Sequence, residues 1–225
     1  MEPILRPVDV TRSAARVSGL AQQEAERLRH HYLGSEHLLL GLLLEGDNLA
    51  ARVLVAHGLD LEVVRAGVDR MISQGLLPGP QPSDAQLLAT LGVDLGAVSG
   101  RLKEAFGAEA YYDAAERVRH RPTQAATHRA VGGPPLLICA RALEIAAHEA
   151  IARDQEVGPE HLLLGLLDEA EDPVETDLTP DERRQRGLLG LPNHGLHPIR
   201  LLVEAHGLTL EALRSAVRSE LDHDQ

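Results

Sequence analysis

An identical eight-residue segment, EHLLLGLL, occurs twice in the chain, beginning at Glu36 and at Glu160. In both copies a Glu-His pair precedes a run of leucines, and Ser35 stands directly before the first pair. If the leucines form a helix, its first turn presents free backbone N–H groups that bind anions, and the adjacent carboxylate can accept hydrogen bonds from a guanidinium. The simpler alternative is that each glutamate only complements the helix dipole. The residues alone leave both interpretations open: a ligand site at Ser35, Glu36 and Glu160, or two dipole partners.

Other residues that could support catalysis or metal binding lack the spacing that such chemistry needs. The 12 histidines include His37 and His161, but no H-E-x-x-H pattern places two histidines on one helix face. The only lysine, Lys103, follows Leu102, so the chain has no phosphate-binding loop of the G-x-x-x-x-G-K-[ST] type. Cys139 is the single cysteine, and no G-x-S-x-G motif occurs. We therefore expect no catalytic residue, no metal site and no cofactor.

The composition narrows the class of protein further. The net charge of −12 disfavours binding to nucleic acid, because its phosphates repel an acidic surface. The chain has no run of about 18 apolar residues to cross a membrane, and its N-terminus lacks the pattern of a signal peptide. A single cysteine permits no internal disulfide, which is typical of a cytoplasmic protein. Apolar residues make up 44% of the chain and aromatic residues only 2%, which favours helices over sheets.

The first copy of the motif lies in a segment with the start and stop signals of four short helices. Thr11 is an expected N-cap, and apolar residues follow it at helical spacing. A second helix is predicted to start near Ser35, which we assign as its N-cap, and a third to end at Gly58. A fourth should begin near Leu61 and end before Gly75. Four helices with short connections predict one compact helical unit.

Leucines cover nearly every face of the helix that the repeated segment would form. Such a helix is expected to be buried on almost all sides, at the centre of its four-helix unit. A glycine in a helix interior costs about 1 kcal/mol relative to alanine. Gly41 and Gly165 therefore indicate places where another helix approaches closely.

The repeat divides the chain into three parts. We assign residues 1–76 to the first repeat and residues 133–225 to the second, which carries an acidic insertion at about 169–197 with a helix predicted at PDERRQRGL. Residues 77–132 hold a half repeat, followed from residue 116 by an Arg/His-rich linker that we interpret as a flexible or surface segment. The predicted fold class is all-α, with tandem four-helix repeats in a pseudo-two-fold relation and an inserted helical half repeat.

The duplicated EHLLLGLL, with the apolar pattern around it, resembles the Clp N-terminal domain, and within that family the ClpC-type double repeat. The resemblance suggests a free-standing Clp N-domain protein of actinobacterial type, without AAA+ ATPase modules. Domains of this family receive substrates and adaptors, and they bind phosphoarginine through the glutamate of the repeated motif. The resemblance implies that Glu36 and Glu160 hold the guanidinium, and that Ser35 with the helix N–H groups takes the phosphate.

Three departures from the family pattern change what we expect. Pro159 precedes the second Glu-His pair, which removes a hydroxyl and an N–H donor, so the second site should bind more weakly. The family usually opens each repeat with Phe-Thr, and those phenylalanines line an apolar peptide surface. Here Val10 precedes Thr11, and the second repeat begins with PPLLIC at residues 134–139, so the aromatic anchors are lost. The insertion is expected to cover or extend the second site.

These observations predict a non-catalytic recognition module. Its ligands would be peptides, adaptors or phosphoarginine-marked proteins, and its partners a Clp ATPase or the substrates of that ATPase. It would modulate a Clp protease system or act as a decoy for it. The alternative is an interaction scaffold whose ancestral ligand pocket has decayed.

Overall fold

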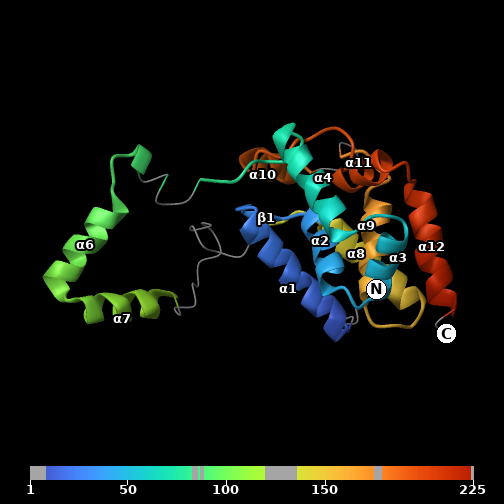
Figure 1. Cartoon of the computed structure of the whole chain (residues 1–225), viewed down its shortest axis with the longest axis horizontal. Helices are drawn as coiled ribbons and strands as arrows, with labels where there is room; N and C mark the ends of the chain where they lie inside the picture. Colours follow the sequence, from blue (N-terminus) through green and yellow to red (C-terminus); the bar gives the residue numbers. More distant parts are fainter. Residues whose placement is uncertain (1–8, 83–85, 87–88, 120–135, 175–178, 224–225) are drawn as a thin grey trace, which may run out of the picture. The chain divides into compact units, whose positions relative to one another are not determined.

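Helices account for nearly all of the regular structure in a computed structural model of the chain (Figure 1). The structure describes residues 9–82, 86, 89–119, 136–174 and 179–223. Residues 9–80 and 136–223 belong to one unit, and the described residues between 81 and 119 belong to a second. Most of the predicted Arg/His-rich linker, with residues 83–85 and 87–88 of the predicted half repeat, lies outside the described residues.

The first repeat contains the four predicted helices: α1 (Arg12–Arg27), α2 (Ser35–Glu45), α3 (Leu49–Ala56) and α4 (Leu61–Ser73). Thr11 caps α1 through its side chain, as predicted, and Asn48 and Asp60 cap α3 and α4 in the same way. Gly58 and Gly75 follow the ends of α3 and α4, and both have positive φ. The predicted stops at these glycines are confirmed, because a positive φ is the conformation that favours glycine.

The second repeat contains α8 (Ala140–Ala152), α9 (Pro159–Glu169), α11 (Pro198–Ala205) and α12 (Leu210–His223). Its insertion carries α10 (Pro180–Leu188), which confirms the helix predicted at PDERRQRGL. Arg29 after α1 and Asp154 after α8 both adopt the left-handed backbone conformation, with φ of 54°. Non-glycine residues rarely adopt this conformation. Its presence at equivalent helix ends indicates that the two repeats fold alike.

The two copies of the repeated segment, α2 and α9, lie within the core of the first unit, to which the other helices of both repeats also contribute (Figure 1). The most completely buried leucines of the two helices are all 0% exposed: Leu40, Leu42, Leu163, Leu164, Leu166 and Leu167. Burial of one leucine side chain contributes about 1.5–3 kcal/mol to folding. The two helices are therefore major contributors to the stability of the unit, as their all-round apolar pattern predicts.

Gly41 and Gly165 lie where a neighbouring helix crosses, as predicted. A Cβ atom at Gly41 would lie 2.5 Å from the carbonyl oxygen of Val17 on α1. A Cβ atom at Gly165 would collide with the carbonyl oxygen of Ala142 on α8. In both cases the obstacle is backbone, which cannot rotate away as a flexible side chain would. Glycine is therefore required for the close packing of α1 on α2 and of α8 on α9.

Short strands connect each repeat to the other. Strand β1 (Tyr32–Leu33) runs parallel to β2 (Leu136–Leu137), so the segment before α8 pairs with the segment before α2. An isolated bridge between Val10 and Val157 joins the segment before α1 to the segment before α9. Each repeat therefore contributes its first residues to the other, which is the exchange expected from the predicted pseudo-two-fold relation.

The second unit contains a helical hairpin formed by α6 (Leu95–Phe106) and α7 (Ala108–Arg119). The Tyr111 hydroxyl donates to Ser99 Oγ at 3.2 Å, and Lys103 donates to the Tyr112 hydroxyl at 3.0 Å. Residues 116–119, which we assigned to the linker, complete α7, because the Ala- and Glu-containing stretch before them favours a helix. Across the described ranges, no helix is long and apolar enough to span a bilayer.

Candidate functional site

The N-cap of α2 is Gly34, and the prediction that Ser35 is the N-cap is wrong. Gly34 has the extended backbone of a cap residue, and its N–H donates to Nδ1 of His37 at 3.0 Å. Ser35 is the first residue inside the helix, and His37 at the third position accepts from the N–H of the cap residue, as the third residue of a capping box does. In α9 the N–H of Gly158 donates to Nδ1 of His161 at 3.1 Å. The histidine of the repeated Glu-His pair is thus a capping residue in both copies.

His37 is the middle member of a chain of hydrogen bonds. Because its Nδ1 accepts a hydrogen bond from Gly34, its proton lies on Nε2, which faces Nδ1 of His30 at 3.0 Å. His30 then carries its proton on Nε2 and donates to the carbonyl oxygen of Pro78 at 3.0 Å. Burial lowers the pKa of His30 to about 4 and also lowers the pKa of His37, so both rings are neutral near pH 7. These hydrogen bonds link the tip of α2 to the segments that follow α1 and α4.

His30, Glu36 and His37 bring three potential metal ligands within 4.8 Å of one another. For His37 to bind a metal through Nε2, its proton would have to move to Nδ1, where it would face the N–H of Gly34. The nitrogens of His30 are engaged by His37 and by the Pro78 carbonyl oxygen. This pattern of hydrogen bonds favours a structural role for the two histidines over metal binding.

Glu36 is buried at the tip of α2 with an unsatisfied oxygen. Its side chain is 2% exposed, and Oε1 has no hydrogen-bond partner among the described residues. Oε1 lies 3.4 Å from Nδ1 of His37, but that nitrogen carries no proton to donate. A buried charged oxygen without a donor costs at least about 1–3 kcal/mol. Glu36 is therefore a candidate site for a cationic group.

The Tyr32 hydroxyl is buried close to the Glu36 carboxylate, toward which it can donate a hydrogen bond. Burial, with the nearby charge of Glu36, raises the pKa of Tyr32 far above its ordinary value. The phenol therefore keeps its proton and can donate. Its ring also stacks on His30, with the ring centroids 5.0 Å apart, which fixes the hydroxyl in position.

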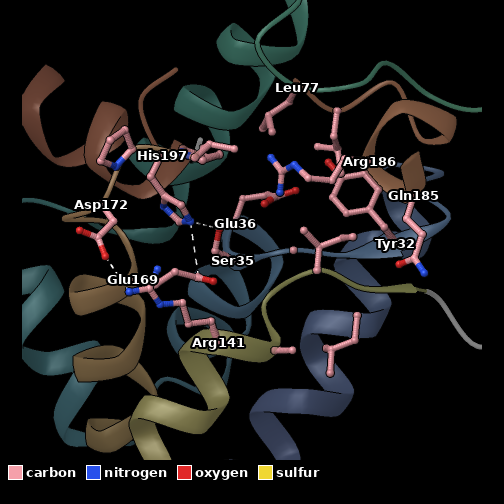
Figure 2. A pocket seen from close by; sticks show the side chains of 18 residues that line it. Tyr32, Ser35, Glu36, Leu77, Arg141, Glu169, Asp172, Gln185, Arg186 and His197 are labelled. Atoms are coloured by element: carbon pink, nitrogen blue, oxygen red, sulfur yellow. Dashed lines mark hydrogen bonds and ion pairs between the residues drawn. The ribbon is translucent and has the colours of Figure 1, made fainter. Parts of the chain in front are cut away.

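Glu36 and Ser35 line a cavity of about 170 Å³ within the first unit (Figure 2). One water needs about 10–15 Å³ of such space, so the cavity can hold a small organic group. The tip of α2, from the first repeat, forms one side of it. The charged and polar side chains of the other walls come from the second repeat and its insertion: Arg141, Glu169, Asp172, Gln185, Arg186 and His197.

The insertion lines the first predicted site, whereas the sequence suggested that it covers or extends the second. Asp172, Gln185 and Arg186 all line the cavity at the tip of α2. Glu169, at the end of α9, lies at the same cavity as Ser35, at the start of α2. The insertion follows directly after α9 and therefore emerges beside the first site, which the linear order of the sequence conceals.

His197, the N-cap of α11, faces Ser35 and Glu169 at one side of the cavity (Figure 2). Its Nε2 lies 3.5 Å from Ser35 Oγ and 3.5 Å from Glu169 Oε2. Nδ1 of His197 accepts a hydrogen bond from the N–H of Ile199 at 3.3 Å, so the proton lies on Nε2. In this tautomer His197 cannot take the proton of Ser35, as the histidine of a serine hydrolase must. The cluster offers the cavity an N–H donor instead of a catalytic base.

Two arginines bring positive charge to the cavity walls. Arg141, near the start of α8, pairs with Asp172 at 2.6 Å. Arg186 on α10 donates from Nε and Nη2 to the Pro192 carbonyl oxygen at 3.1 and 2.9 Å. Figure 2 shows the Arg186 guanidinium pointing toward Glu36. The cavity thus combines a carboxylate at a helix tip with cations on its walls, which suits a ligand that carries both charges.

Glu160, the third residue predicted for the site, lies apart from this cavity. Its side chain, at the tip of α9, is 19% exposed, and it is not among the residues that line the cavity. Pro159 is the first residue of α9 and provides no N–H there. The structure brings Ser35 and Glu36 together in one site and leaves Glu160 outside it.

The architecture defines an all-α protein of two four-helix repeats that exchange short strands, with a charged cavity at the tip of one buried helix. Residues 9–92 match the family described as the Clp repeat (R) N-terminal domain. This part of the chain therefore belongs to the Clp N-terminal domain family, as the duplicated motif predicts.

Relatives in this family include much longer proteins. The chloroplastic chaperone protein ClpC of Pisum sativum is 51% identical over 67 residues, which are 30% of this chain and 7% of that protein. The ClpA homolog of Cyanidium caldarium, an ATP-binding subunit of ATP-dependent Clp protease, is 40% identical over 96 residues, 43% of this chain and 10% of that protein. The chain thus spans a tenth or less of the length of these relatives.

A solved structure shares the fold of the chain. The crystal structure of the N-terminal domain of ClpD, a caseinolytic protease associated chaperone from Arabidopsis thaliana, aligns with 99% of this chain and 99% of its own length. The TM-score is 0.50 and the sequence identity is 15%. The likeness concerns the arrangement of the helices.

Proposed function

We propose that the chain is a non-catalytic recognition module that binds phosphoarginine-marked proteins or peptides through the cavity at the tip of α2. Like the N-terminal domains of Clp ATPases to which it is related, it would receive substrates or adaptors, and it would modulate a Clp protease system or act as a decoy for it. Ser35 and Glu36 are the proposed ligand-binding residues, and Glu160 is proposed as a separate, weaker site.

The unpartnered Oε1 of Glu36 is the observation that carries the proposal. A guanidinium keeps its charge when buried and presents N–H donors in a planar fork. It can therefore satisfy a carboxylate oxygen that the neutral His37 leaves without a proton. The ammonium of a lysine fits less well, because it is more strongly hydrated and loses its proton more readily when buried.

The surroundings of Ser35 support binding of the phosphate. Ser35 lies in the first turn of α2, where the helix dipole and the free backbone N–H groups favour an anion. Its hydroxyl faces Nε2 of His197, which carries a proton. A phosphoryl group bound here would be adjacent to the guanidinium at Glu36, as the covalent structure of phosphoarginine requires.

An interaction scaffold with a decayed pocket is the second candidate. The low exposure of Glu36 favours it, because a ligand must enter between the walls to reach the carboxylate. The loss of aromatic anchors also favours it: Val10 and Leu137 are 55% and 43% exposed but offer only small aliphatic surfaces. A scaffold of this kind would hold its partner through the insertion and the acidic surface.

Affinity capture from an arginine-phosphorylated cell lysate, followed by mass spectrometry, separates the two candidates. Wild-type chain, Glu36→Gln and Glu160→Gln would serve as baits. Recognition predicts that arginine-phosphorylated peptides are recovered by the wild type, lost with Glu36→Gln and mostly retained with Glu160→Gln. The scaffold function predicts one constant partner that all three baits recover equally.

A further inference from the structure

The insertion holds one side chain in a fixed position at the cavity. Arg186 lies in the last turn of α10, and its guanidinium is fastened by two hydrogen bonds to the carbonyl oxygen of Pro192. The backbone N–H of Leu191 donates to the Arg186 carbonyl oxygen at 2.9 Å, which closes the turn after α10. Leu191 itself is 6% exposed and packs into the core. Arg186 therefore costs little further conformational entropy when a ligand binds it.

The Arg186 side chain points toward Glu36, the residue proposed to bind the guanidinium of the ligand (Figure 2). Arg186 and Glu36 line the same cavity, and Figure 2 shows the Arg186 guanidinium directed toward the Glu36 carboxylate. The positive charge of Arg186 is near enough to Tyr32 to oppose, in part, the rise in the pKa of that phenol. The cavity is thus lined by an unpartnered carboxylate oxygen at the α2 tip and by a cation on the insertion.

We infer that Arg186 binds the anionic end of the ligand whose guanidinium lies against Glu36, and that it selects an N-phosphorylated arginine over an unmodified one. This inference rests on the proposed function of the cavity. A guanidinium matches two phosphate oxygens in a bidentate, charge-assisted contact, and unmodified arginine, a cation without a phosphoryl group, cannot make that contact. In phosphoarginine the two charges are separated by a single N–P bond, so one cavity can hold both.

The inference gives the insertion a role in the specificity of the first site. Arg141, the other arginine that lines the cavity, pairs with Asp172 at 2.6 Å. Arg186 lines the same cavity as Ser35, so it would contact from the α10 side the phosphoryl group that Ser35 and the N–H groups of α2 bind at the helix tip.

The test is a titration of the full chain with two matched short peptides, one carrying phosphoarginine and one carrying arginine at the same position. The variants are Arg186→Gln, Arg186→Lys and the control Arg183→Gln, which removes an exposed arginine of α10 that does not line the cavity. We expect Arg186→Gln to weaken binding of the phosphorylated peptide about tenfold or more and not to weaken binding of the unmodified peptide, whose guanidinium is a cation like that of Arg186. Arg186→Lys should restore part of the affinity, and Arg183→Gln should behave as the wild type.

Equal affinity of wild type and Arg186→Gln for the phosphorylated peptide would overturn the inference and leave the proposed function intact. Tighter binding by Arg186→Gln would overturn it in another way, because Arg186 would then compete with the ligand for Glu36. Failure of the wild type to bind the phosphorylated peptide, or an unchanged affinity in Glu36→Gln, would overturn the proposed function and the inference with it. Circular dichroism of each variant establishes that the helices are intact before binding is compared.

Discussion

Nε2 of His37 donates a hydrogen bond to Nδ1 of His30 across 3.0 Å, and both rings are buried. His37 therefore has two structural contacts: it accepts a hydrogen bond from the helix cap, Gly34, and it donates one to His30 in the loop after α1. In the second repeat, the corresponding Nε2 of His161 is buried without a hydrogen-bond partner among the described residues. The two copies of EHLLLGLL are therefore identical in sequence but differ in what surrounds them.

Replacing the capping histidines should separate these two roles. We expect His37→Ala to lower the free energy of unfolding by at least about 1 kcal/mol more than His161→Ala. Only the His37→Ala substitution removes the hydrogen-bond partner of His30. Both variants lose the contact to the N-cap glycine, so His161→Ala is the matched control. Urea denaturation followed by circular dichroism measures the difference. Equal losses would show that the His30 contact contributes nothing to stability.

The stability of the chain should fall between pH 7 and pH 5. The pKa of His30 is about 4 in the folded chain, chiefly because of burial, with neighbouring His37 and Arg27 acting in the same direction and Glu36 opposing them. The unfolded chain, with an ordinary histidine pKa near 6.5, binds more protons as the pH drops through this range. The expected loss approaches about 1.4 kcal/mol per pH unit for each such histidine, and the lowered pKa of His37 adds to it.

Urea unfolding at pH 7, 6 and 5 tests this dependence. His30→Gln should be less stable at pH 7 and should lose less stability on acidification. Glu24 and Glu149 contribute little to the change between pH 7 and pH 5, because their pKa values lie below the ordinary glutamate value of 4.5. A wild-type chain with the same stability at pH 7 and pH 5 would refute the assignment of His30 as a buried, neutral ring.

Alanine at Gly41 should destabilise the first repeat. The added Cβ would meet the Val17 carbonyl oxygen at 2.5 Å and the Ala21 nitrogen at 3.0 Å, so α1 and α2 must move apart. Overpacking of this kind costs about 1–3 kcal/mol. Gly19→Ala on α1 is the control, because no atom lies within 4 Å of its added Cβ. It should leave stability unchanged or raise it by up to about 1 kcal/mol. Thermal unfolding of both variants measures the effect. A Gly41→Ala variant as stable as the wild type would contradict the close packing of α1 on α2.

The ion pair between Glu24 on α1 and Arg65 on α4 should matter more than a pair on the surface. Burial alone would raise the pKa of Glu24, but hydrogen bonds from Arg65 at 2.6 Å and Arg27 at 2.8 Å lower it. Arg65→Ala leaves a carboxylate that is 5% exposed without one partner, and we expect a loss of about 1–3 kcal/mol. Arg200→Ala, which removes the exposed pair with Glu204, should change stability by at most about 0.5 kcal/mol. Similar losses in the two variants would contradict this difference.

Local signals in the sequence predict most of the helices correctly. Thr11 marks the start of α1, and Gly58 and Gly75 mark the ends of α3 and α4, because caps and left-handed turns depend on nearest neighbours. The leucines of the duplicated motif predict a buried helix, and Gly41 predicts a close helix crossing. Such features depend on the chemistry of a few adjacent residues.

The cavity could not be predicted in the same way. Ser35 reads as an N-cap, and only the contact from His37 to Gly34 shows that the helix begins one residue earlier. His197 and Arg186 reach the tip of α2 through the pairing of the two repeats, which no local pattern encodes. The insertion was the one feature of the sequence that indicated a change near a site. Its position after α9 suggested the second site, because the sequence does not show that the end of α9 lies beside the start of α2.

The central claim is that the tip of α2, and not the tip of α9, is the principal ligand site. Isothermal titration of phosphoarginine into wild type, Glu36→Gln and Glu160→Gln tests it most directly. We predict that Glu36→Gln weakens binding at least about tenfold, which corresponds to about 1.4 kcal/mol, and that Glu160→Gln has a much smaller effect. Equal losses in the two variants, or a loss confined to Glu160→Gln, would contradict the claim.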